Sequence, residues 1–184
     1  MPFGSSSLCA SLTLKGQASD VEPNSVTPFR ALETEDPLSQ TFYKIWIHLV
    51  WSTKEREPLL LKEMRQQVYN HMREKAAKEE YHLDELGGTA DHIHCLISLQ
   101  PRFSVSEVVN KLKGESSHWI NSEKLTKGHF AWQGGFGAFS VCEEHLSRVR
   151  AYIQNQEEHH RKKSFAGEVA DFLEAYNAER VLAD

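Results

Sequence analysis

Two histidines stand two residues apart in the segment 91–99, which reads DHIHCLISL. Its alternating pattern predicts a β-strand, in which successive side chains point to opposite faces of the sheet. Ile93 and every second residue after it then form an apolar face, and His92 and His94 share the other face. Two imidazoles on one strand face can reach the same divalent metal ion. Two ligands do not complete a metal site, so an exposed strand with two incidental histidines is the alternative.

A second candidate pair is formed by Tyr152 and Gln156, which lie four residues apart in a predicted helix. Residues at this spacing sit one above the other on the same helix face. The pair alone is weak evidence for chemistry. A half-buried tyrosine beside a surface glutamine would explain it equally well.

Three further features are candidates to support these residues. Asp91 could orient His92 or His94 through a hydrogen bond, although a turn residue is an equal alternative. His145 lies seven residues before Tyr152 on the same helix face, and a surface histidine is its simpler interpretation. The run 157–160, EEHH, resembles a second metal cluster. Adjacent residues diverge around a helix, however, so we predict a solvated helix end there.

Composition limits the classes of protein that fit. The 184 residues, 40% of them hydrophobic, are enough for one globular domain. No run approaches the ~18 apolar residues of a membrane span. The three cysteines are odd in number and include no Cys-x-x-Cys pair, which argues against a disulfide framework and fits a reducing cytoplasm. The net charge of −5 requires any nucleic-acid partner to meet a locally basic surface.

Residues 1–40 differ from the rest of the chain. They are rich in Ser, Thr and Pro and show no periodicity. The piece 8–14 is too short and too polar for the hydrophobic region of a signal peptide. We predict a disordered or atypical N-terminal extension over 1–40 and a folded domain over 41–184.

The first half of this domain has the pattern strand, helix, strand, strand. Residues 42–51 are dense in β-branched and aromatic side chains and predict the first strand. Pro58 opens a predicted helix that fades near Glu80, with apolar residues at helical spacing. Residues 82–86 predict a weaker strand, and the turn-forming residues before Asp91 predict a hairpin with the histidine strand.

The second half continues with a helix, a strand and further helices. Ser104 and Glu107 form a capping box that begins a helix. Two short β-like runs, 130–132 and 138–141, flank a glycine-rich loop that predicts a hairpin or a mobile connection. Helices are predicted over 143–160 and 167–177. The order β-α-β-β-α-β predicts an α+β fold, a ferredoxin-like or RRM-like antiparallel sheet with helices on one face and additional C-terminal helices.

Taken in order, these motifs resemble the single-tyrosine transposases of the IS200/IS605 type, members of the His-hydrophobe-His (HUH) endonuclease superfamily. The resemblance covers roughly residues 41–177 and is carried by five segments: 48–54 (HLVWSTK), 91–94 (DHIH), 111–114 (KLKG), 132–141 (WQGGFGAFSV) and 152–160 (YIQNQEEHH). Two positions depart from the family's pattern: Phe136 stands where a tyrosine is frequent, and Cys142 where a serine is. Neither belongs to the catalytic set.

The resemblance implies specific roles. His92 and His94 match the metal-binding pair, Gln156 the third metal ligand and Tyr152 the nucleophile. The family uses Mg or Mn and binds single-stranded DNA, often at hairpins. It cuts by forming a 5′-phosphotyrosine and leaving a free 3′-OH. It works as a homodimer in which the tyrosine helix of one chain can complete the histidine site of the other. A host-adapted relative that handles palindromic repeats would share every one of these residues.

DNA binding would need cationic and aromatic side chains on the surface. The candidates for phosphate contacts and base stacking are Lys111, Lys113, Lys124, Lys127, Arg148, Arg150, Trp119 and Trp132.

Two other functions fit parts of the pattern. A non-catalytic binder of single strands or hairpins would keep the fold, but the presence of Tyr152 and Gln156 argues against it. A metal-dependent or nucleotidyl hydrolase could also use a His-x-His strand. Such nucleotide hydrolases need a third alternating histidine, and position 96 is Leu96.

Overall fold

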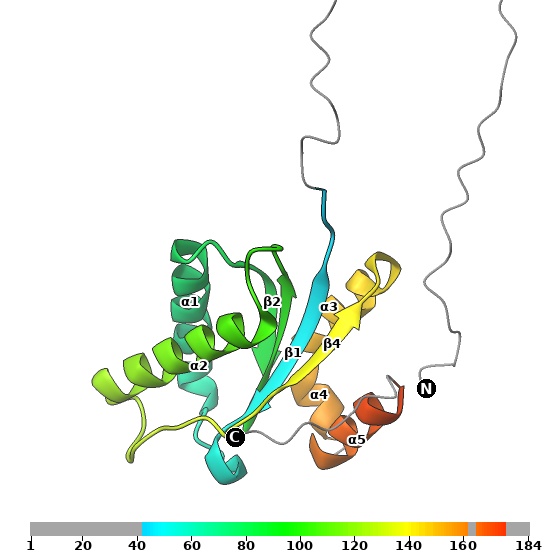
Figure 1. The fold of residues 1–184 in the computed structure, drawn as a ribbon. Coiled ribbons are helices and arrows are strands. Elements are labelled where there is room, and N and C mark those ends of the chain that lie inside the picture. The colour runs from blue at the N-terminus through cyan, green and yellow to red at the C-terminus, as the bar shows by residue number, and fades with distance from the viewer. Residues whose placement is uncertain (1–41, 162–164, 176–184) are drawn as a thin grey trace, which may run out of the picture. The chain divides into compact units, whose positions relative to one another are not determined.

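The computed structural model describes residues 42–161 and 165–175 (Figure 1). Four strands form one antiparallel sheet: β1 (Trp46–Ser52), β2 (His82–Gly88), β3 (His92–Ser98) and β4 (Gly137–Val141). Their order is β2-β3-β1-β4, with α1 (Lys62–Lys78) between β1 and β2 and α2 (Val105–Ser122) between β3 and β4. The predicted β-α-β-β-α-β architecture is confirmed.

The predicted extension over 1–40 lies outside the described residues, so its boundary stays a prediction. Among the described residues, no helix is long and apolar enough to cross a membrane.

One face of the sheet is buried beneath α1 and α2. Ile93, Cys95 and Ile97 of β3 lie in this core together with Leu49 and Trp51 of β1, and all are at most 2% exposed. The helices contribute apolar stripes at the spacing that the sequence predicts; their buried members are Met64, Val68, Met72 and Ala76 of α1 and Val108, Val109, Leu112 and Ile120 of α2. The opposite side chains of β3, including both histidines, therefore point to the second face of the sheet.

The start of α2 agrees with the prediction from the sequence, whereas the start of α1 does not. At α2 the backbone N–H of Glu107 donates to Ser104 Oγ at 3.1 Å, which confirms the predicted N-cap. The first helix begins at Lys62 rather than at Pro58. The segment before it is held in an irregular path, because the Leu60 N–H donates to Ala90 O and the Leu60 side chain is fully buried.

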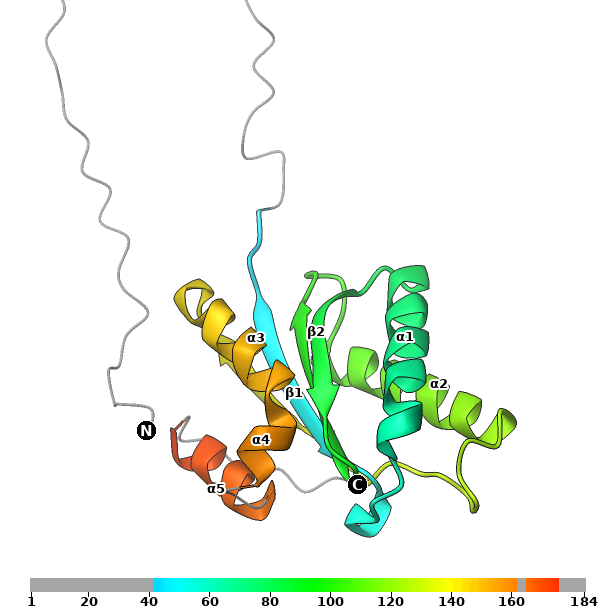
Figure 2. The same ribbon diagram turned by 180° about the vertical axis from the view of Figure 1, so that it is seen from behind.

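The second face of the sheet is covered by C-terminal helices (Figure 2). The single helix predicted over 143–160 is three elements: the 3-10 turn η3 (Glu143–His145), α3 (Leu146–Gln154) and α4 (Gln156–His160). The break lies at Asn155, whose side-chain amide donates to Ala151 O at 2.7 Å and so competes with helix continuation. The last described helix, α5, spans Phe165–Ala175.

The glycine-rich loop does not close a hairpin. Trp132 forms a bridge with Thr53, just after β1, while β4 pairs with β1 itself. Both β-like runs therefore pair with β1 or the residue after it, and not with each other. The glycine-rich loop is part of the connection from α2 to β4. Lys113 Nζ anchors it by donating to Gln133 O and Gly135 O at 2.7 and 2.8 Å.

Gly87 on β2 allows α3 to pack directly against the sheet. A Cβ atom at this position would lie 2.3 Å from the backbone oxygen of Ile153, the residue after Tyr152. Gly87→Ala should therefore push α3 outward and destabilise the fold by roughly 1–3 kcal/mol, the usual cost of overpacking. Chemical denaturation measures this change. The control is Gly114→Ala inside α2, where a Cβ meets nothing within 4 Å and helix propensity favours alanine. Equal stability of the two variants would contradict the tight packing of α3.

Candidate functional site

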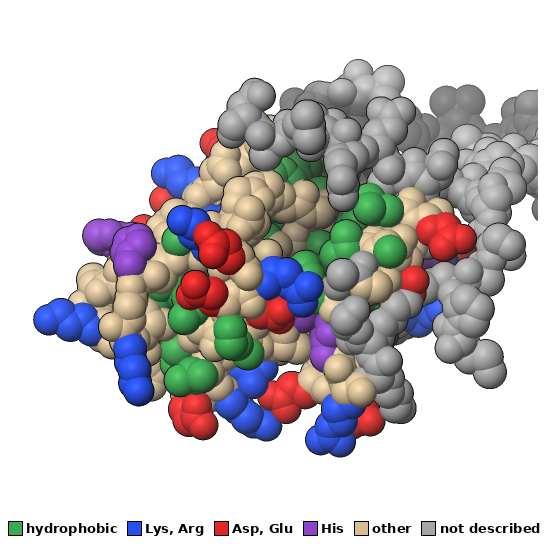
Figure 3. All heavy atoms as spheres, turned by 90° about the horizontal axis from the view of Figure 1, so that it is seen from below, with side chains coloured by type: hydrophobic (Ala, Val, Ile, Leu, Met, Phe, Trp, Pro, Cys, Tyr) green, Lys and Arg blue, Asp and Glu red, His purple; other side chains and the backbone are tan. Residues whose placement is uncertain are grey.

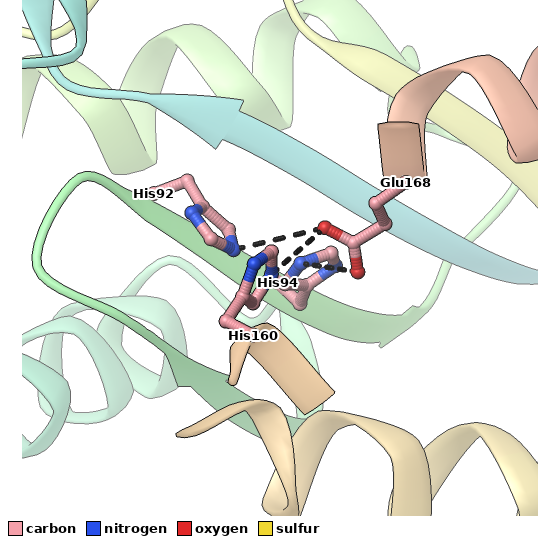
Figure 4. A group of neighbouring side chains, drawn as sticks. All are labelled: His92, His94, His160 and Glu168. Carbon is pink, nitrogen blue, oxygen red and sulfur yellow. Dashed lines mark hydrogen bonds and ion pairs between the residues drawn. The ribbon is translucent and has the colours of Figure 1, made fainter. Parts of the chain in front are cut away.

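His92 and His94 lie side by side on the second face of the sheet, and both are fully buried. They face Ser52 and Val50 of β1 across the ladder, so the site lies at the centre of the sheet and not at an edge. Figure 4 shows the two imidazoles converging with His160 of α4 and Glu168 of α5. The predicted sharing of one strand face by the two histidines is thus present in the structure.

Asp91 fixes the orientation of His92. Its Oδ1 lies 2.7 Å from His92 Nδ1 and also accepts from Thr89 Oγ1, while its Oδ2 accepts from Arg56 Nη2 at 2.9 Å. Burial alone would raise the pKa of the Asp91 carboxyl, but hydrogen bonds from His92, Arg56 and Thr89 hold it well below its usual range. The ionised carboxylate makes Nδ1 the protonated nitrogen, so His92 Nε2 keeps its lone pair for a cation.

His48 plays the corresponding part for His94. His48 Nε2 lies 3.0 Å from His94 Nδ1, and the two buried rings are stacked at 5.1 Å. Burial, with a smaller contribution from His94, lowers the pKa of His48 to about 3, and burial also holds the pKa of His94 well below its usual value. Both imidazoles are therefore neutral at pH 7. With its Nδ1 engaged by His48, His94 presents Nε2 to the interior of the site.

His48 was not among the predicted site residues. The alternation of β1 pointed to it, because the His48 side chain lies on the face opposite to the buried Leu49 and Trp51. Only the register of β1 against β3 turns that face toward His94.

Gln156 reaches the site from the break between α3 and α4. It is 1% exposed, and its Oε1 lies 3.5 Å from His92 Nε2. Its Nε2 donates to Tyr152 O at 3.2 Å, which directs the amide oxygen toward the histidines. The structure thus brings together the three residues predicted as metal ligands, and their role as ligands stays a prediction.

His160 and Glu168 also enter this site. One ligand atom from each of His92, His94, His160 and Glu168 lies within 4.8 Å of all the others. Glu168 Oε2 is 3.1 Å from His160 Nε2, and Glu168 Oε1 is 3.5 Å from His94 Nε2. Burial raises the pKa of the Glu168 carboxyl to about 7, although His92 opposes this shift.

The predicted solvated end at 157–160 is therefore wrong for His160, whose side chain is 14% exposed. It holds for the neighbouring acids, which face outward: Glu157 pairs with Lys62 and Arg65, and Glu158 pairs with Arg161. The break at Asn155 rotates α4 relative to α3, and the resulting direction of His160 cannot be read from helical spacing along one continuous helix.

These donors fit a divalent cation. Imidazole nitrogens, an amide oxygen and a carboxylate oxygen converge from β3, α4 and α5, and this mixture suits ions from Mn²⁺ to Zn²⁺. The outer nitrogens of both strand histidines are engaged by Asp91 and His48, as is usual for metal-binding imidazoles.

Tyr152 lies beside this cluster on α3. Its ring contacts the rings of His94 and His48 edge-on, with centroids 5.6 and 6.1 Å apart, and packs with Val50 and Phe139. Its hydroxyl oxygen is buried. The phenol and the candidate metal ligands therefore lie beside one another within a single chain.

Comparison with known proteins connects this geometry to a family. Residues 41–156, well over half of the chain, match the family described as "Transposase IS200 like". The chain belongs to this family. It is 27% identical to the ISDra2 transposase TnpA of Deinococcus radiodurans over 120 residues, which cover 62% of this chain and 85% of the relative. It is also 27% identical over 128 residues to the IS200 transposase of Salmonella typhimurium, covering 66% and 83% of the two chains.

Solved structures show the same fold for this IS200-like transposase. A transposase candidate from D. radiodurans superposes with a TM-score of 0.52 at 27% identity, covering 63% of this chain and 93% of the other. A REP-associated tyrosine transposase bound to a REP hairpin gives a TM-score of 0.52 at 15% identity, covering 79% and 92% of the two chains. The resemblance seen in the sequence motifs is confirmed.

Four of the predicted DNA-contacting cations of this IS200-like transposase are exposed, namely Lys111, Lys124, Lys127 and Arg148. Several of the predicted cations also have contacts within the protein: Lys113 anchors the glycine-rich loop, Arg150 binds both oxygens of Asp84 at 2.6 and 3.1 Å, and Lys111 lies 4.0 Å from Glu79. Figure 3 shows cationic and acidic side chains interspersed on one face instead of a single basic patch.

The two candidate stacking tryptophans are half-buried. Trp119 stacks on His71 at 4.2 Å, and Trp132 donates from Nε1 to Ser116 Oγ at 3.0 Å while its ring packs against Trp51. Both rings therefore have packing roles in the domain. His145 is exposed in η3 and is not among the described His and Glu side chains that are grouped so that they could hold a metal ion.

Proposed function

We propose that this protein cleaves and rejoins single-stranded DNA through a covalent 5′-phosphotyrosine at Tyr152. The observation that carries the proposal is the position of Tyr152 against His94, with Gln156 one helical turn later facing His92. The proposed nucleophile thus lies beside the three proposed metal ligands. Family membership supports the same assignment.

In the proposed reaction, the Tyr152 oxygen attacks the phosphorus of a phosphodiester. A P–O bond to tyrosine forms, the bond to the 3′ oxygen breaks, the phenol loses its proton, and the leaving 3′ oxygen gains one. The covalent link conserves the bond energy, so a 3′-OH can later attack it and rejoin a strand without ATP.

The chain's residues explain why this reaction needs a cation. A phenol with a pKa of ~10 is mostly protonated at neutral pH and is a weak nucleophile. His92, His94 and Gln156 would hold Mg²⁺ or Mn²⁺, which when bound would neutralise the phosphate oxygens and orient the phosphorus. Asp91 and His48 keep the histidine nitrogens turned toward that position.

The proposed substrate is single-stranded DNA that folds into a hairpin. The support is the family resemblance together with the similar fold of the REP-associated transposase bound to a REP hairpin. Exposed Lys124, Lys127 and Arg148 are the proposed phosphate contacts. The proposed reaction takes place in the cytoplasm, the compartment that the cysteine content favours.

The direct test is incubation with labelled single-stranded hairpin DNA and Mn²⁺, followed by a denaturing gel. We expect a protein–DNA adduct that survives denaturation and is absent when EDTA is added. Binding of the hairpin without any adduct would instead support the non-catalytic hairpin binder.

The proposal extends to a homodimer with shared sites, which rests on the family resemblance. A single chain already places Tyr152 and Gln156 against its own histidines, so exchange of the tyrosine helix between subunits would rebuild the same contacts. Mixing inactive Tyr152→Phe with inactive His92→Ala should then restore partial cleavage, because some heterodimers carry one intact composite site. No restored activity after verified subunit exchange would show that each site is built within one chain, and a monomer in sedimentation would exclude the dimer.

A further inference from the structure

Helix α5 closes the site with two side chains. The ring of Phe165 stacks on His92 at 4.3 Å, with the Arg56 guanidinium 5.0 Å from the ring centre, and packs against the same Val50–Phe139 cluster as Tyr152. One turn later, Glu168 is only 2% exposed and points between the histidines. Figure 4 shows its carboxylate reaching from α5 over His92, His94 and His160.

The Glu168 carboxylate lies where a substrate phosphate would have to bind. Its oxygens are 3.5 Å from His94 Nε2 and 3.8 Å from His92 Nε2, the two nitrogens turned toward the cation position. A carboxylate and a phosphodiester are both oxyanions and bind the same kind of hard or borderline cation. The Tyr152 hydroxyl is buried as well, and Phe165 of α5 packs against the same cluster as the Tyr152 ring.

The fold permits α5 to leave without loss of the main core. That core lies between the sheet and helices α1 and α2, and it contains none of the described residues of α5. The contacts described for Phe165 and Glu168 are instead made to residues of the site and to Arg56 beside it.

We propose that Glu168 binds the site's cation in the DNA-free protein and that the scissile phosphate displaces it, together with α5, when single-stranded DNA binds. The inference rests on the proposed function and adds a closed resting state to it. Glu168 and His160 then complete the cation's ligands between reactions. Displacement of α5 exposes Tyr152 only when a phosphate takes the place of the carboxylate.

The first test measures cation binding without DNA. Glu168→Gln should weaken Mn²⁺ binding in calorimetry by at least about tenfold, since the loss of even an outer-shell partner has such an effect. The matched control is Glu174→Gln, which removes the same charge from an exposed position of α5 and should leave the affinity unchanged. Equal affinities in the two variants would overturn the assignment of Glu168 as a ligand. Thermal unfolding of each variant confirms that it is folded.

The second test follows α5 itself by hydrogen exchange in the non-cleaving Tyr152→Phe variant. Addition of hairpin single-stranded DNA with Mn²⁺ should accelerate amide exchange in α5, whereas double-stranded DNA should not. Undiminished protection of α5 with bound DNA would overturn the displacement, even if the wild-type protein forms the adduct.

The third test separates this inference from the proposed function. At saturating Mn²⁺, Glu168→Gln should form the adduct faster than Glu174→Gln, because no carboxylate competes with the phosphate. Slower adduct formation would make Glu168 a permanent ligand and contradict its displacement. If the wild-type protein forms no adduct at all, the proposed function fails, while calorimetry and hydrogen exchange still decide whether Glu168 binds the cation and whether α5 moves.

Discussion

Tyr152→Phe is expected to eliminate the covalent protein–DNA adduct while the protein stays folded and still binds hairpin DNA. The substitution removes only the phenol oxygen, and the ring that packs with Val50 and Phe139 remains. The loss should exceed the ~10²–10⁴-fold effect of removing an acid–base group, because no other atom in the site can form the phosphotyrosine bond. Denaturing gels of wild-type and variant protein with labelled DNA measure it.

Other tyrosines provide the control for this result. Tyr69 lies in the core cluster on the opposite face of the sheet, and burial raises its pKa to about 12. Tyr81 is also in that core, with its ring edge-on to Phe103 at 4.8 Å. Tyr81→Phe should therefore keep wild-type adduct formation. Mass spectrometry should find the nucleotide on Tyr152, and an adduct on another tyrosine would overturn the mechanism even though the fold is correct.

His92→Ala is expected to abolish cleavage and to weaken Mn²⁺ binding, with hairpin binding largely retained. The His92 ring contacts Asp91 through Nδ1 and lies near Gln156 and Glu168 through Nε2. Its loss therefore removes a proposed ligand that lies between the other proposed ligands. A decrease in cleavage of more than about 100-fold is expected, since loss of an outer-shell partner alone costs 10–100-fold. Cleavage rates and calorimetric Mn²⁺ titrations check both effects.

The control for this prediction is His145→Ala, which removes an exposed imidazole and should change neither quantity. Asp91→Asn should give an intermediate decrease of about 10–100-fold, because it only loosens the orientation of His92. Cleavage at the wild-type rate by His92→Ala would show that the assigned cation site is wrong.

Local patterns in the sequence determined the fold and the centre of the site. The alternation in 91–99 placed His92 and His94 on one face because side-chain direction in a strand depends only on position along it. The apolar stripes of α1 and α2, and the Ser104 cap, likewise follow from residues within a few positions of one another. These features depend only on neighbouring residues, so the folded structure contains them as the sequence predicts.

Tertiary structure alone decided which distant groups complete the site. His48 meets His94 through strand register, His160 turns inward because α4 departs from α3 at Asn155, and Glu168 arrives on a separate helix. The spacing of residues in the sequence likewise did not predict the partners of Lys113 and Arg150. Each of these contacts joins elements far apart along the chain. Their geometry depends on how whole strands and helices dock, and the periodicity of a single segment contains no information about the segment that will pack against it.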